Sequence, residues 1–119
     1  MVLARFSRAM RMNRPGDFTR VFRQGKRCGG TGLTLIALPS NVGHPRLGLA
    51  IAKKHIKLAC QRNRIKRLIR DSFRQHQHQL GSLDIVVLSR ADILQRDITQ
   101  VRTALGRHWM TVKTQWQQS

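Results

Sequence analysis

The sequence predicts an α/β fold, a two-layer sandwich in which a small central β-sheet packs against α-helices. Three observations lead to this prediction. The chain has 119 residues, the length of one domain. Apolar residues recur at helical spacing in three stretches, and the stretches between them show the short apolar runs and alternation of strands. The expected order is therefore αβββαβα, in a single domain over residues 1–119.

The first expected elements are a short helix and a glycine-rich strand. Residues 1–12 indicate a flexible basic arm, after which Asn13 and Pro15 supply a helix start, since proline is favoured in the first turn. In GDFTRVFRQG three apolar side chains fall at helical spacing: Phe18, Val21 and Phe22. Gly25 can end this helix. The next segment, KRCGGTG, predicts at best a ragged strand.

Two stronger strand patterns follow. LTLIALP (33–39) is an apolar run with β-branched members, and a proline stops it. RLGLAIA (46–52) alternates, with Leu47, Leu49 and Ile51 on one side and Arg46, Gly48, Ala50 and Ala52 on the other. The first set is expected in the core. The second set leaves room for a flat ligand, and it fits close packing under another element equally well.

A long helix is expected over residues 58–79, which contain neither glycine nor proline. At about 100° per residue, one side gathers the apolar residues Leu58, Ile65, Leu68, Ile69 and Phe73. The other side gathers Asn63, Lys66, Arg67, Arg70 and Arg74, with Arg62 and Arg64 beside the apolar stripe. The polar face is thus almost wholly cationic, whereas a solvated helix normally mixes charges to gain i,i+4 pairs. Gly81 is expected to end the helix.

The chain closes with a strand and a helix. DIVVLSR (84–90) is a short apolar run between turn residues, which predicts a buried strand. Residues 97–116 predict a helix that begins with a capping box of Asp97 and Gln100. Its apolar residues follow helical spacing: Ile98, Val101, Leu105, Trp109, Val112 and Trp116. Residues 113–119 are expected to form a C-terminal tail.

Net charge is the strongest indication of function. The chain has 23 Lys and Arg against 5 Asp and Glu, a net charge of +18 at pH 7. A small domain with this charge repels itself unless an anion neutralises it. An acidic membrane surface or an acidic protein is possible, but nucleic acid is the commonest such anion. Because the cations of the long helix lie on one face, we expect the chain to bind nucleic acid.

No arrangement typical of an enzyme or a metal site is evident. All five acidic residues are Asp, and no two of them have the spacing of an acid/base pair. His76 and His78 fall on different helix faces and make a poor metal pair. Cys28 and Cys60 are far apart and indicate free thiols in a reducing cytosol. Since no apolar run is long enough to cross a bilayer, we expect a cytoplasmic protein.

The stretch KKHIKLACQRNRIKRLIRDSFR (53–74) resembles the bacterial ribonuclease P protein family, whose RNR motif is matched by RNRIKRLIR (62–70). Similar segments, DFTRVFRQGKR (17–27) and PRLGLAIAKK (45–54), precede it in the family's order. The resemblance implies a left-handed βαβ crossover, against the usual right-handed rule. It also implies a protein cofactor of a catalytic RNA that, with Mg²⁺, removes the 5′ leader from precursor tRNA. The Mg²⁺ would be bound mainly by the RNA, and no metal tightly by the protein.

The resemblance also assigns roles to residues of this chain. It implies that eight residues face the catalytic RNA: Lys53, Lys54, Arg62, Asn63, Arg64, Lys66, Arg67 and Arg70. It implies that the leader lies in a cleft between the first helix and the sheet, against Phe18, Phe22 and Arg46. Some members carry an aromatic residue on the middle strand, where this chain has Ile36. The spacing of Phe18 and Phe22 alone is more typical of core residues.

Two other functions compete with this prediction. A structural RNA-binding protein of ribosomal type would explain the charge, the size and the fold, but not the RNR motif. A nuclease acting alone is disfavoured because no carboxylates are clustered. The sequence therefore predicts the protein subunit of ribonuclease P. Its expected partners are the catalytic RNA and precursor tRNA, without a membrane and without an obligate protein partner.

Overall fold

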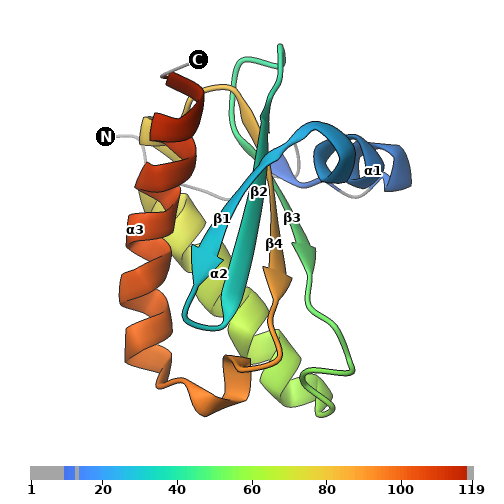
Figure 1. Cartoon of the computed structure of the whole chain (residues 1–119), viewed down its shortest axis with the longest axis vertical. Coiled ribbons are helices and arrows are strands. Elements are labelled where there is room, and N and C mark those ends of the chain that lie inside the picture. The colour runs from blue at the N-terminus through green and yellow to red at the C-terminus, as the bar shows by residue number, and fades with distance from the viewer. Residues whose placement is uncertain (1–9, 13, 118–119) are drawn as a thin grey trace.

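The computed structural model describes residues 10–12 and 14–117 and shows one sheet with helices on both faces (Figure 1). The elements are α1 (Pro15–Gln24), β1 (Lys26–Gly30), β2 (Leu33–Pro39), β3 (Arg46–Ala50), α2 (Ala59–Leu80), β4 (Leu83–Ser89), the 3₁₀ helix η2 (Ile93–Gln95) and α3 (Ile98–Gln117). The predicted α/β class and the order αβββαβα are confirmed. Helices α2 and α3 form the main helical layer, and α1 covers part of the opposite face of the sheet.

The strands lie in the order β1-β2-β4-β3. β2 pairs antiparallel with β1 and with β4, and β3 pairs parallel with β4. Parallel neighbours need a crossover connection, which α2 supplies between β3 and β4. The βαβ unit that the resemblance implies is therefore present, and it puts α2 directly after the edge strand.

The residues before α1 lie against the free side of β3. Arg11 forms a parallel bridge with Leu47, and the Met12 N–H donates to the Leu47 carbonyl oxygen at 2.9 Å. Only 4% of Met12 is exposed, so residues 10–12 are part of the packed domain rather than of the expected arm. Residues 1–9 of that arm, and Asn13, lie outside the described residues.

The central strands bury both of their faces, as their continuous apolar runs predict. On one face, Leu35 and Ile85 pack with α2 and α3, and on the other, Ile36 and Val86 pack with α1. From α2, the predicted core residues Ile65, Leu68, Ile69 and Phe73 are buried. Leu58 is a correction: it precedes the first turn of α2 and is 58% exposed, because the helix begins one residue later.

Two tryptophans of α3 hold this helix against its neighbours, Trp109 against α2 and Trp116 against β2. The Trp109 indole N–H donates to the Ser72 hydroxyl of α2 at 2.8 Å, and its ring meets Phe73 edge-on at 5.7 Å. The Trp116 indole N–H donates to the Ala37 carbonyl oxygen at 2.9 Å. Because α3 continues through residue 117, the first part of the expected tail, residues 113–117, is helical.

Some of the residues predicted to begin or end the helices lie at the observed helix ends. Pro15 occupies the first turn of α1, and the Asp97 carboxylate accepts the Thr99 N–H at 3.1 Å at the start of α3. Gly25 follows α1 as predicted, but its φ of −76° is not left-handed. Glycine is required there because a Cβ would lie 2.6 Å from a methyl group of Ile36.

Both cysteines are free thiols. Burial raises the pKa of the Cys28 thiol to about 11, so this group is protonated at neutral pH and is a poor nucleophile. Cys60 is exposed on α2. No helix within residues 10–12 and 14–117 is both long and apolar enough to span a membrane.

Candidate nucleic-acid interface

The cationic residues of α2 lie on the side of the helix that faces away from the core. The helix contains six Lys and Arg residues against one Asp. Asn63, Arg64 and Arg67 are exposed, while Lys66 and Arg70 are half-buried. The buried stripe orients this face, because apolar residues at helical spacing have only one way to reach the sheet. α2 therefore presents Arg64, Arg67 and Arg74 to solvent.

A pocket of about 400 Å³ opens among these arginines. It is lined by Arg11, Asn63, Arg67, Arg70, Asp71 and Arg74. Guanidinium groups bind phosphate oxygens in a forked, bidentate geometry, so a pocket with four of them suits an RNA backbone. Arg11 is a residue that sequence reasoning missed, since its place beside α2 depends on tertiary contacts such as the backbone bridge to Leu47.

Arg62 differs from the other residues of the RNR motif. One of its terminal nitrogens, Nη1, donates to the carbonyl oxygens of Ile56 and Lys57, both at 2.9 Å. The side chain therefore holds the segment that leads into α2, and it is half-buried. Its contact with RNA stays a prediction.

Lys53 and Lys54 are exposed in the turn between β3 and α2. The turn is held by Ser89 at the end of β4, whose hydroxyl oxygen accepts the Ala52 N–H at 2.9 Å. The same hydroxyl lies 3.0 Å from Nδ1 of His55. Both lysines thus project from an anchored turn that leads toward the N-terminal end of α2.

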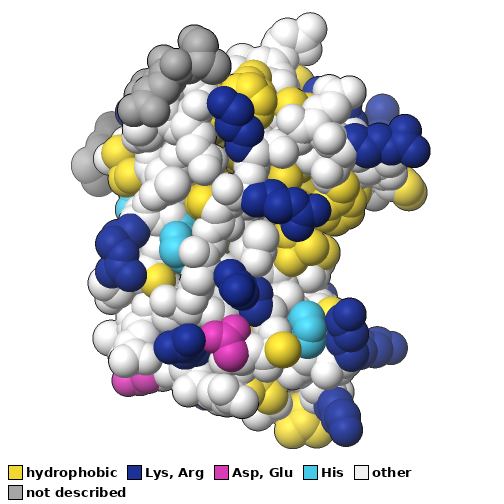
Figure 2. Space-filling view, in the orientation of Figure 1, with side chains coloured by type: hydrophobic (Ala, Val, Ile, Leu, Met, Phe, Trp, Pro, Cys, Tyr) yellow, Lys and Arg dark blue, Asp and Glu magenta, His cyan; other side chains and the backbone are white. Residues whose placement is uncertain are grey.

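The predicted leader surface lies where α1 crosses β3. The ring of Phe18 covers Gly48 so closely that a Cβ on Gly48 would lie 2.7 Å from the ring. At Gly48, the face of β3 that carries the small side chains is therefore closely packed under α1. Phe22 is 37% exposed, and its ring centre lies 6.4 Å from that of Phe18. Figure 2 shows hydrophobic side chains gathered in a hollow beneath α1, with Lys and Arg side chains beside them.

Arg46 lies at the start of β3 and is bound to a buried carboxylate. Its Nε and Nη2 atoms donate to the two oxygens of Asp84, each at 2.7 Å, and hydrogen bonding to Asp84 raises the pKa of Arg46. Arg20 of α1 also donates to Asp84, whose side chain has no exposed surface. This cluster joins α1, β3 and β4. A leader contact by Arg46 stays a prediction, since much of its guanidinium is already engaged.

The described part of the chain offers no evident metal site. Among residues 10–12 and 14–117, no group of three or more His, Cys, Asp or Glu side chains is arranged to hold a metal ion.

Comparisons with a family model, with a related sequence and with solved structures all point to the same family. The family model for Ribonuclease P matches residues 6–113. The chain is 46% identical to the ribonuclease P protein component of Pectobacterium atrosepticum over 109 residues, which covers 92% of each chain. The RNase P protein of Staphylococcus aureus superimposes with a TM-score of 0.79 at 27% identity, covering 88% of this chain and 95% of that one. The RNase P protein of Thermotoga maritima gives 0.72 at 26% identity, covering 87% and 96%.

Proposed function

The chain belongs to the ribonuclease P protein family, whose members are protein subunits in tRNA processing, and we propose how its surfaces serve that role. In this proposal the cationic face of α2 docks on the catalytic RNA, and the surface formed by α1 and β3 receives the leader of precursor tRNA. The observation that carries the proposal is the cationic face of α2, a helix with six cations and a single acid in a domain of net charge +18.

The docking of α2 rests on charge and geometry. Phosphate neutralisation by Lys and Arg supplies most of the sequence-independent affinity of a protein for nucleic acid. Arg64, Arg67 and Arg70 project from a helix whose opposite side is packed into the core, so the backbone that carries them is already ordered before RNA binds. Lys53, Lys54, Asn63 and Lys66 extend this surface, and Arg62 supports it from behind.

The leader is proposed to bind beneath α1. Unpaired bases stack on aromatic side chains, and Phe22 is the aromatic residue of α1 with the larger exposed surface. Phe18 acts as the support of this surface, because its ring fills the space above Gly48. Arg46 completes the surface at the start of β3 but remains bound to Asp84.

The chemistry is assigned to the RNA. The catalytic RNA, with Mg²⁺ bound mainly by the RNA, would hydrolyse the phosphodiester that joins the leader to the mature tRNA. The protein would lower the repulsion between two polyanions by lying between them, which raises the affinity for the substrate. It would retain Mg²⁺ only indirectly, by stabilising the RNA geometry that binds the ions.

A cleavage assay tests the proposed function. Precursor tRNA is incubated in Mg²⁺ with the protein alone, with the catalytic RNA alone, and with both. We expect leader removal with the RNA, at a lower Mg²⁺ and salt requirement when the protein is present, and none with the protein alone. Leader removal by the protein alone would refute the assignment of the chemistry to RNA. An unchanged Mg²⁺ requirement would refute the subunit role.

Replacement of Phe22 tests the leader surface. Phe22→Ala is expected to weaken the binding of precursor tRNA to the holoenzyme by roughly tenfold, since one base–aromatic stack is lost. Mature tRNA, which has no leader, should bind as before. Phe22 is a cleaner probe than Phe18, whose removal would also leave a cavity above Gly48. Equal losses for precursor and mature tRNA would show that Phe22 acts only in packing.

A further inference from the structure

Next to the cationic face of α2 lies an apolar slot that the proposed function does not use. Its volume is about 310 Å³, and it separates the first turns of α2 from η2 and the start of α3. Its floor is apolar, since Ile65, Ile93 and Val101 are among the buried core residues. Leu94 forms part of its rim and is 52% exposed. Such a volume is at the low end for a small-molecule site and suits a single flat group.

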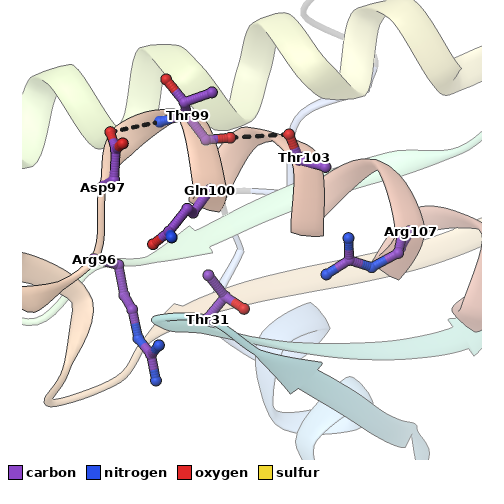
Figure 3. A pocket seen from close by; sticks show the side chains of 7 residues that line it. All are labelled: Thr31, Arg96, Asp97, Thr99, Gln100, Thr103 and Arg107. Carbon is purple, nitrogen blue, oxygen red and sulfur yellow. Dashed lines mark hydrogen bonds between the residues drawn. The ribbon is translucent and has the colours of Figure 1, made fainter.

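A polar recess of about 380 Å³ lies next to this slot and is shown in Figure 3. Gln100 and Arg107 extend from α3 toward the side of Thr31, which lies in the turn between β1 and β2, and Thr99 and Thr103 also line the recess. The Thr103 hydroxyl already donates to the Thr99 carbonyl oxygen at 3.0 Å. The recess therefore offers mainly hydroxyl, amide and guanidinium groups, with the Asp97 carboxylate as an acceptor.

Arg96 lines both the slot and the recess and so joins them. Its Nε donates to the Asp92 carboxylate at 2.9 Å, and that hydrogen bond lowers the pKa of Asp92. The contact through Nε orients the guanidinium group while its side chain stays 46% exposed. Arg64 of the RNR motif lines the other side of the slot. The slot is thus bounded by two arginines, one of which belongs to the face of α2 proposed to bind RNA.

We propose that the slot and the recess form one groove that binds a single unpaired nucleotide of the catalytic RNA. The base lies in the apolar slot beside Leu94, between Arg64 and Arg96. The sugar and phosphate follow the polar recess toward Arg107. This inference rests on the proposed function, because it takes the α2 face as the start of the RNA interface.

The chemistry of the groove favours a nucleotide over other occupants. An apolar floor between guanidinium groups fits a base, whose faces are apolar and stack on arginine. A sugar–phosphate has acceptor oxygens for Arg107 and Thr31 and donor hydroxyls for Asp97, which matches the mixed lining of the recess. An apolar side chain of a partner protein would supply no acceptor for Arg64 and Arg107, and none for the guanidinium nitrogens of Arg96 beyond the Nε that Asp92 engages.

Two variants and two matched controls test the groove. Leu94→Ala removes the exposed rim of the slot, and Arg96→Ala removes the shared cation. Met110→Ala and Arg102→Ala change an exposed methionine and an exposed arginine of α3 that line neither hollow. Affinity for the catalytic RNA is measured for each purified protein over a series of salt concentrations. Thermal melts confirm that all four variants are folded.

We expect Leu94→Ala to lower the affinity up to roughly tenfold without changing the salt dependence, because it removes an uncharged apolar contact with the base. Arg96→Ala should lower the affinity and also reduce the slope of log K against log salt by about 0.7, the value for one phosphate contact of a single strand. The two controls should match the original protein.

The outcomes separate this inference from the proposed function. If the original protein does not bind the catalytic RNA, the proposed function fails. If it binds and Leu94→Ala equals the Met110→Ala control, the base slot is refuted while the proposed function stands. A benzophenone side chain at position 94 identifies the occupant by crosslinking. Crosslinks to an unpaired nucleotide of the catalytic RNA support the groove, and crosslinks confined to the leader or to another protein refute it.

Discussion

Asp84→Asn is expected to lower the free energy of unfolding by about 3 kcal/mol. The Asp84 carboxylate has no exposed surface, and it accepts hydrogen bonds from Arg46 and Arg20. Removing its charge leaves Arg46, 19% exposed, in a partly buried site without its main anion. The loss in unfolding free energy should be at the low end of the range for broken buried ion pairs, because Arg20 is 38% exposed and can turn toward water.

Urea unfolding followed by circular dichroism measures this change. Asp71→Asn is the matched control, since its ion pair with Arg74 is on the surface, with the Asp71 side chain 52% exposed. Exposed pairs of this kind contribute little, so the control should stay within about 0.5 kcal/mol of the original protein. A loss for Asp84→Asn as small as that of the control would mean that the cluster does not hold α1 on the sheet.

The double variant Arg64→Ala with Arg67→Ala is expected to bind the catalytic RNA about 100-fold more weakly. Each side chain is exposed on α2, and each charge-assisted contact with a phosphate contributes about 1.5 kcal/mol, close to a factor of ten. The slope of log K against log salt should also fall by about 1.5, because two fewer counterions are released. Neither residue supports the core, so the thermal midpoint should not fall.

Arg102→Ala with Lys113→Ala is a suitable control, since it removes two cations of α3 that belong neither to the face of α2 nor to the groove. Binding measured at four or more salt concentrations gives both the affinity and the slope. A weaker affinity with an unchanged slope would place Arg64 and Arg67 outside the phosphate contacts. A fall in the thermal midpoint would indicate a structural role instead.

Much of the fold was predictable because its elements follow simple periodicities. The strand over residues 33–39 and the long helix have the predicted positions within one or two residues, since their apolar runs and stripes are unbroken. The cationic face of α2 follows from the same stripe, and it needed no tertiary information. The RNR motif then indicated the family, which the comparisons confirm.

The tertiary relations of single side chains were not predictable. Asp84 is the second residue of an apolar strand, and nothing in its neighbours indicates that Arg20 and Arg46 converge on it from distant segments. Phe18 and Phe22 are four residues apart, about one turn of α1, yet one covers Gly48 and the other is 37% exposed. Arg11 lies beside α2 next to a backbone bridge to Leu47, which depends on the position of β3 at the edge of the sheet.

The bridge at β3 has a consequence for the solubility of the protein. β3 ends the sheet, and an edge strand offers unpaired N–H and C=O groups on which a second molecule can add a strand. The Met12 N–H donates to the Leu47 carbonyl oxygen, so this acceptor is no longer open to an added strand. The Arg11 side chain adds a positive charge next to it. Residues 10–12 therefore cover part of the β3 edge and make edge-to-edge pairing with a second molecule less favourable there.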